Sequence, residues 1–276
     1  MQEFFDFLSD GFSFLGDASI WNFFMKLVKT LLVSTPEEFA PDAYSWVVND
    51  IYPWFMTIGA IMLNLFFYIG FMKSVNNLKE GVTTEMFIEA MIKVVVAHSL
   101  MIMGLDLFND LNAISIHMTK YIVGSTNFEI ASGNADAGIF LMKLIFGIFY
   151  VIIEIACSIL VIVEILKNRL YLYLSICAFP IALSTLPGGR GVENTFFAWI
   201  KAALTYIFQF SIIALMLTLG SLIGSSFMPA LTTASSQVGG WFDGIYTVLG
   251  QVVIMVFVTG AVKASDSILE KLFGLR

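Results

Sequence analysis

The feature that most constrains this chain is a series of long apolar stretches separated by shorter polar segments. Most of these stretches reach the length of about 20 residues that an α-helix needs to cross a hydrocarbon layer about 30 Å thick. The chain has 276 residues, of which 58% are hydrophobic and 13% charged, whereas a soluble domain carries about 25% charged residues. Because so much apolar surface requires lipid, the sequence predicts an all-α integral membrane protein with five to six transmembrane helices.

Five of the apolar stretches are long enough to be full spans, and a sixth is short. The sixth, 170–186, contains Pro180 and ends in a Pro-Gly-Gly-Arg-Gly run, so it is either a full span or a re-entrant segment. The segments 109–137, after an amphipathic start, and 224–243 have the polar composition of loops. The predicted full spans cover about 51–72, 86–107, 138–166, 196–223 and 245–262.

Residues 1–45 form a separate predicted region. Apolar residues recur there at helical spacing between acidic ones, which predicts one or two amphipathic helices that are extracytoplasmic or interfacial. Helices that bind lipid head groups usually carry many basic residues, whereas this region begins acidic and offers only Lys26 and Lys29. Packing against protein is therefore the favoured interpretation. Residues 46–276 are predicted to form one polytopic membrane domain.

The distribution of basic residues predicts the orientation, because loops rich in Lys and Arg stay on the cytoplasmic side. If 170–186 dips into the membrane and returns, most basic residues fall on one side; a full sixth span would place the basic C-terminus outside. The pattern favours five full spans in the cell (inner or plasma) membrane, with the N-terminus outside and the C-terminus cytoplasmic, and six remain open. The residues on the cytoplasmic side would be Lys73, Lys79, Lys167, Arg169, Arg190, Lys263, Lys271 and Arg276.

Ionisable residues inside the third span are candidate functional residues, because a charge at bilayer depth costs at least about 2.5 kcal/mol. Lys143, Glu154 and Glu164 share one face of this helix, whose remainder is mainly Ile, Leu, Val and Phe. That face either lines an aqueous passage or a subunit contact, or Glu154 is bonded within the bundle while Lys143 and Glu164 reach opposite interfaces. Full satisfaction of these side chains within the chain would remove the argument that this face meets other proteins or a passage.

In the second span, Glu89 and Lys93 stand four residues apart, the spacing of an intrahelical ion pair. Mutual neutralisation is the favoured interpretation, and a role in transport is the alternative. His98, on the opposite face, is interpreted as a structural residue in preference to a proton relay. The sequence contains no nucleophile with a matching base, no phosphate-binding glycine loop and no metal-ligand spacing. It therefore predicts neither an enzyme nor a cofactor.

The stretch from Glu164 to Lys201 carries a recognisable pattern. A basic residue leads into a short apolar helix, a Phe-Pro-Ile-Ala turn and a small-residue loop follow, and an aromatic residue and a lysine begin the next span. This pattern resembles the central region of the TrbL-like polytopic proteins of type IV secretion and conjugation machines. The matching positions are Arg169, Pro180, Pro187, Gly188, Gly189, Arg190, Trp199 and Lys201.

The resemblance implies a non-enzymatic channel or scaffold subunit that contributes to a translocation route for DNA–protein substrate. It implies several copies of the chain in a larger complex, with other channel subunits and cytoplasmic ATPases as partners and transient contact with the substrate. Without a long extracytoplasmic domain or hydrophilic tail, the sequence is similar to the compact versions in Gram-positive conjugative elements. Two other functions stay open: a membrane-anchored interaction protein without a pore, and a small-solute or ion transporter that uses Glu89, Lys93, Glu154 and Glu164.

Overall fold

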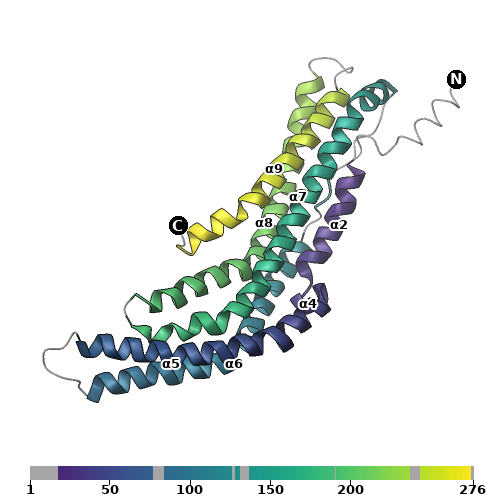
Figure 1. Cartoon of the computed structure of the whole chain (residues 1–276). Helices are drawn as coiled ribbons and strands as arrows, with labels where there is room; N and C mark the ends of the chain where they lie inside the picture. The colour runs from purple at the N-terminus through teal and green to yellow at the C-terminus, as the bar shows by residue number, and fades with distance from the viewer. Residues whose placement is uncertain are drawn as a thin grey trace. The chain divides into compact units, whose positions relative to one another are not determined.

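The computed structural model describes residues 18–76, 84–125, 128–130, 137–189, 191–236 and 243–274. All regular elements among these residues are helices (Figure 1). Five helical segments are long and apolar enough to cross a membrane, which confirms the predicted all-α polytopic fold with five spans. The segments are Pro41–Met72, Phe87–Gly124, Gly147–Gly188, Glu193–Ala230 and Tyr246–Leu272.

The second to fifth long helices are much longer than the predicted spans, the first nearly matches its prediction, and short helical turns lead into two of the helices. A π-helical turn, η1, connects α4 to α5, and a 3-10 turn, η2, follows α7. The elements in chain order are α2 (Ser19–Val33), α3 (Pro36–Phe39), α4 (Pro41–Ser45), η1 (Trp46–Ile51), α5 (Tyr52–Asn76), α6 (Thr84–Gly124), α7 (Ala137–Ser184), η2 (Leu186–Gly188), α8 (Glu193–Ser236) and α9 (Asp243–Leu272).

Helix α7 corrects the break that the sequence suggested before residue 170. The helix runs from Ala137 to Ser184 with Pro180 inside it, so most of the stretch 170–186 continues the helix of the third span. The polar residues that suggested the break are buried and bonded inside the protein: Asn168 is completely buried and Arg169 is 1% exposed. Their internal contacts allow an uninterrupted helix where the sequence alone indicated a polar connection.

Helices α6 and α8 also extend into segments predicted as connections, and in α6 the polar side chains there bond to α8. Ser115 of α6 donates a hydrogen bond to the carbonyl of Ile207 on α8, at 2.6 Å. One turn further along both helices, the hydroxyls of Thr119 and Ser211 lie 3.1 Å apart. The constant offset between the paired residues shows that α6 and α8 run in the same direction, as alternate spans of a membrane protein do.

The described chain forms two compact units, each assembled from three segments. Unit 1 comprises Met1–Val33, His117–Leu166 and Phe210–Ser265, and unit 2 comprises Ser34–Ile116, Lys167–Gln209 and Asp266–Arg276. The predicted region 1–45 is thus divided between the units, with α2 in unit 1 and α3 and α4 in unit 2. The helix prediction for residues 1–17 concerns residues outside the described part of the chain.

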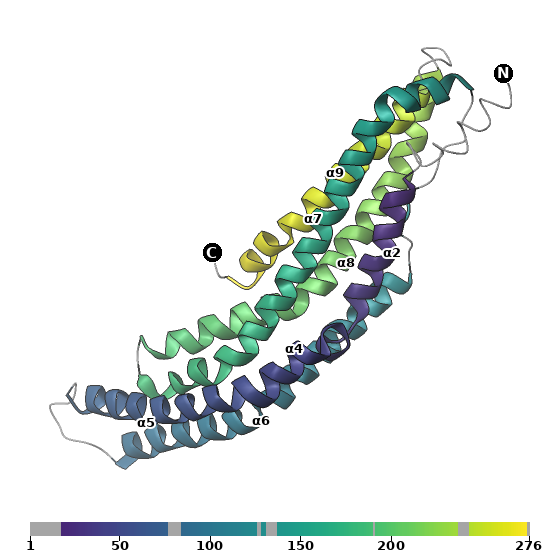
Figure 2. The same cartoon turned by 45° about the vertical axis from the view of Figure 1, so that its right-hand side comes forward.

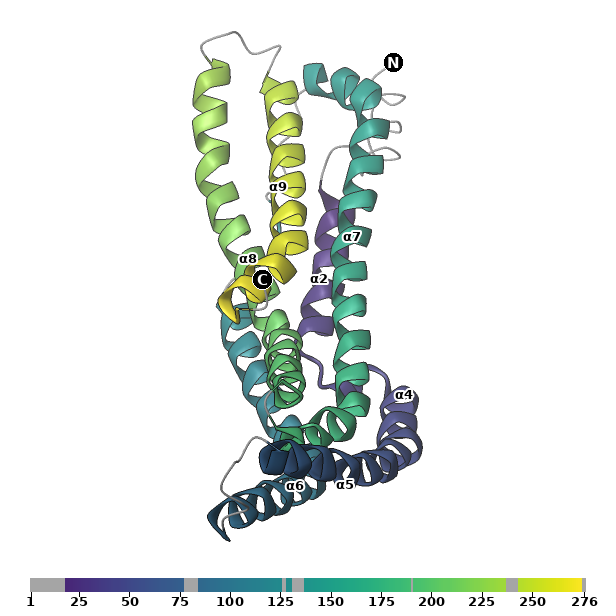
Figure 3. The same ribbon diagram turned by 60° about the vertical axis from the view of Figure 1, so that its left-hand side comes forward.

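In unit 1, α2 packs with the first part of α7 and with parts of α8 and α9 (Figure 3). Its buried residues, Trp21, Met25, Val28 and Leu32, recur every three or four positions and therefore form one stripe along the helix. They belong to the same apolar core as Ile213 of α8. Helix α2 therefore uses its apolar stripe against protein of its own chain.

In unit 2, α5 and α6 lie side by side (Figure 2), and two glycines of α5 allow close approach of the chain that follows residue 179. A Cβ atom at Gly59 would lie 2.7 Å from the carbonyl oxygen of Pro180, and one at Gly70 would collide with the carbonyl oxygen of Pro187. Contacts of this kind occur only where a side chain is missing. The two glycines therefore position α5 against the end of α7 and against η2.

The exposed side chains of α7 are apolar and its buried ones include polar residues, which indicates what surrounds the helices. Ile148, Phe149 and Ile152 are exposed, whereas Glu154 and Ser158 are completely buried. A helix at the surface of a soluble protein has the opposite arrangement, with its polar residues outward. Apolar residues outside and polar residues inside are expected where hydrocarbon surrounds the protein. The chain is a multi-pass membrane protein.

Candidate functional site

The predicted polar face of α7 turns into the interior of unit 1 at Glu154. This side chain has no exposed surface, and its Oε1 accepts a hydrogen bond from the backbone N–H of Trp21. Trp21 lies in the first turn of α2, where backbone N–H groups have no acceptor within the helix. Because the N-terminal end of a helix also carries a partial positive charge, Glu154 stabilises the start of α2 from the neighbouring helix.

Other polar side chains hold the same end of unit 1. The hydroxyl of Tyr150, one turn before Glu154, donates to Oε1 of Gln251 on α9 at 3.0 Å. The side-chain amide of Asn22 donates to the carbonyl of Ile130 at 3.2 Å and accepts from the N–H of Ile130 at 2.9 Å. Helices α7 and α9, and α2 with the segment 128–130, are therefore joined by directed hydrogen bonds as well as by apolar packing.

Glu154 is bonded within the bundle, as one of the two interpretations of the polar face expects for this residue. Glu164 is 8% exposed and also lies in the interior. The side chain of Lys143 lies outside the described part of the structure. The sequence could not anticipate this result, because Glu154 and its donor Trp21 are 133 residues apart in the chain.

The pair in α6 agrees with its predicted role. Nζ of Lys93 lies 3.0 Å from Oε1 of Glu89, four residues earlier, which confirms the intrahelical ion pair. Both side chains are exposed, by 40% for Lys93 and 68% for Glu89. His98 is also exposed.

Unit 2 contains a polar cluster that sequence reasoning missed. Asp266 of α9 accepts hydrogen bonds from Nζ of Lys167 on α7 and from Nε2 of Gln209 on α8. Asn168 donates to the carbonyl of Tyr206 at 3.0 Å. The sequence placed Asp266 beyond the end of the last span, and no local spacing connects it to Lys167. The cluster joins three helices of unit 2 through charged and amide groups.

Arg169, the first residue of the family-like pattern, binds the segment that follows α2. Its Nη2 donates to the backbone carbonyl and the hydroxyl of Ser34, and its guanidinium carbon lies 5.3 Å from the centre of the Phe39 ring. One turn later, the hydroxyl of Tyr173 donates to the carbonyl of Pro36 at 2.7 Å. Residues 34–39 are therefore fixed to α7 by two side chains, and Arg169 has a structural role.

The rest of the family-like pattern also forms packing contacts. Pro187 and Gly188 are buried in η2, and Gly189 has φ = 75°, a left-handed conformation that favours glycine. The Trp199 ring lies 5.1 Å from the Phe179 ring, and Nζ of Lys201 lies 3.5 Å from the carbonyl oxygen of Gly274. Arg190 lies outside the described residues.

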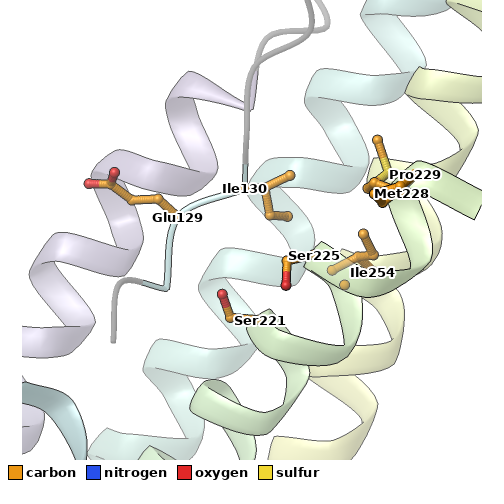
Figure 4. A pocket seen from close by; sticks show the side chains of 8 residues that line it. Glu129, Ile130, Ser221, Ser225, Met228, Pro229 and Ile254 are labelled. Atoms are coloured by element: carbon orange, nitrogen blue, oxygen red, sulfur yellow. The ribbon is translucent and has the colours of Figure 1, made fainter. Parts of the chain in front are cut away.

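In each unit, described residues line a cavity that could accept a small molecule. In unit 1, a cavity of about 400 Å³ lies between the segment 128–130, α8 and α9 (Figure 4). The carboxylate of Glu129 turns away from Ser221 and Ser225 there (Figure 4) and lies 3.6 Å from Nζ of Lys26. In unit 2, a cavity of about 250 Å³ has an almost entirely apolar lining that includes Phe179. No group of three or more possible metal ligands occurs among the residues that the structure describes.

Comparison with known proteins adds no family assignment. No family model, curated protein or solved structure matches the chain.

Proposed function

We propose that the chain is a non-enzymatic scaffold or channel subunit of a conjugation-type (type IV) secretion machine, with other channel subunits and cytoplasmic ATPases as partners. Two lines of reasoning support the proposal. The first is the resemblance of the stretch from Glu164 to Lys201 to TrbL-like proteins. The second is the way in which the chain uses its ionisable residues.

The internal use of charged residues is the observation that carries the proposal. Glu154 holds α2, Arg169 holds the segment 34–39, and Lys167 with Asp266 joins α7 to α9. A transporter needs ionisable groups that reach a wet cavity, where they bind and release the transported species. Groups that are engaged in holding helices together favour a structural subunit over the transporter alternative.

We further propose that the N-terminus lies outside and the C-terminus in the cytoplasm. Five spans place the two ends on opposite sides, and basic residues occur in the last turn of α5 (Lys73), in the connection that follows it (Lys79) and at the end of α9 (Lys271). Lys167 and Arg169, which the sequence analysis also counted, lie within α7 and no longer bear on the orientation. The remaining loop charges support the same orientation.

Cysteine labelling tests this orientation. In a variant with Cys157→Ser and Cys177→Ser, we expect Thr233→Cys near the end of α8 to react with a membrane-impermeant maleimide added outside intact cells. Lys271→Cys at the end of α9 should react only after the membrane is opened. Both positions are exposed in the structure, so a lack of reaction reports the side of the membrane. The reverse labelling pattern would overturn the orientation.

The secretion role predicts recovery in a complex. The full chain, purified through an affinity tag in mild detergent from cells that carry the transfer system, should bring down the ATPases and the other channel subunits. Deletion of the chain should abolish DNA transfer, and restoring the chain should restore it. If instead the purified chain alone supports solute or ion flux in liposomes, and DNA transfer continues without the chain, the transporter function replaces the proposed one.

A further inference from the structure

Most of the outer surface of unit 1 is apolar, as a surface in contact with acyl chains should be. Helix α7 has Glu154 as its only charged residue between positions 144 and 163, and α8 carries no charged residue between 202 and 236. Large apolar residues point outward on each of the three long helices. They include Ile148, Phe149 and Ile152 on α7, Leu215, Leu219 and Leu222 on α8, and Val253, Val256 and Phe257 on α9.

Helix α2 has a different outer surface. Lys26 follows Asn22 by four positions, and Lys29 and Thr30 follow Lys26 by three and four, so the four residues share one side of the helix. Nζ of Lys26 lies 3.6 Å from Oε1 of Glu129, and the two side chains are 72% and 44% exposed. We refer to these five residues as the α2 face. Lys26, Thr30 and Glu129 are exposed, whereas Lys29 and Asn22 are half-buried. The α2 face thus places charged and polar groups beside the apolar outward residues of α7 named above.

The α2 face lies beside the apolar part of α7. Helix α2 begins where Trp21 binds Glu154, and Figures 1 and 3 show it alongside α7. Its buried residues share one core with Val161 and Ile165 of α7. Charged side chains directed at acyl chains are strongly disfavoured, so the α2 face must be covered by something other than lipid.

The composition of this surface identifies the cover. Phe23 and Leu27, 67% and 42% exposed, lie next to the charged residues on α2. A water-filled passage would be lined by polar groups, whereas apolar anchors beside a charged rim are typical of protein interfaces. The face carries both signs of charge, so Lys26 and Lys29 of one molecule complement Glu129 of another. We propose that the α2 face is a contact between copies of this chain; this inference rests on the secretion subunit proposed above, for which the family resemblance implies several copies.

Charge reversal gives a specific test. The triple variant Lys26→Glu, Lys29→Glu, Glu129→Lys keeps the pair within the chain but reverses the sign of every charge on the face. Two copies with different affinity tags are co-expressed and purified through one tag. Wild type should co-purify with wild type and the triple variant with the triple variant, whereas wild type and the triple variant should associate at least about tenfold less. Equal recovery of the mixed pair would overturn the proposal.

A matched control separates the α2 face from a general effect of charge. Lys120 is exposed on α6 in the same unit, and Lys120→Glu changes the net charge by the same amount as the triple variant. Lys120→Glu should co-purify with wild type normally, and equal weakening by both variants would overturn the proposal. In the cysteine-free variant, reaction of Lys29→Cys with a membrane-impermeant maleimide in the assembled machine would also overturn it, by showing a water-facing surface.

The two proposals fail in different ways. If wild-type chains recover the ATPases normally but the mixed pair assembles as well as like pairs, only the α2 contact is wrong. If wild-type chains associate with one another through the α2 face but never recover the ATPases, and DNA transfer does not require the chain, the secretion function is wrong.

Discussion

Replacing Gly59 with alanine should destabilise the protein by about 1–3 kcal/mol, because the new methyl group has no space. An added Cβ would lie 2.7 Å from the carbonyl oxygen and 2.8 Å from the carbonyl carbon of Pro180. Both atoms belong to the backbone of α7, which cannot turn aside as a flexible side chain can. The measurement is the thermal unfolding midpoint of the purified chain in detergent, and the same direction is expected for Gly70→Ala against Pro187.

Gly260→Ala is the matched control for this prediction. Gly260 also lies inside a long helix, α9, but nothing lies within 4 Å of the Cβ that alanine would add. Since alanine is favoured over glycine inside a helix by about 1 kcal/mol, this substitution should raise the unfolding midpoint. A lower unfolding midpoint for Gly59→Ala and a higher one for Gly260→Ala would show that close packing, and not helix propensity, decides the result at Gly59. Equal midpoints for both variants would contradict the contact between α5 and α7.

The spans could be predicted because length and hydropathy are local properties of the sequence. The pattern around Glu89 and Lys93 could be read in the same way, since both partners lie on adjacent turns of one helix. The ends of the helices could not be predicted, because a polar residue in a helix and one in a loop look alike in the sequence. Ser115 and Thr119 illustrate this point, since their hydroxyls bond to residues 92 positions away on α8.

The interior contacts were out of reach for the same reason. The sequence singled out Glu154 and Arg169 correctly as unusual residues in an apolar environment. It could not identify their partners, because the N–H of Trp21 and the carbonyl of Ser34 are backbone groups. Almost every residue carries such groups, so the residue type does not mark them. Asp266 was overlooked because it follows the apolar part of α9. An ionisable residue inside a span therefore indicates a contact, but the fold decides whether that contact is internal or external.

Replacing Glu154 with leucine should release the start of α2 and cost about 1–3 kcal/mol, because the N–H of Trp21 loses its acceptor in a buried site. Glu154→Gln keeps a carbonyl oxygen as acceptor and should cost less. Glu89→Leu is the control, since Glu89 is exposed and pairs only within its own helix, and its loss should change stability by less than about 1 kcal/mol. The thermal unfolding midpoint measures the cost.

The readout that separates a local from a global effect is amide hydrogen exchange of residues 19–33. In Glu154→Leu, exchange in α2 should accelerate while α8 and α9 stay protected. Because α2 carries the proposed contact between copies, the same variant should still insert into the membrane but lose assembly and DNA transfer. Unchanged exchange in α2 would contradict the role of Glu154. Accelerated exchange with normal transfer would show instead that α2 need not be fixed for the machine to work.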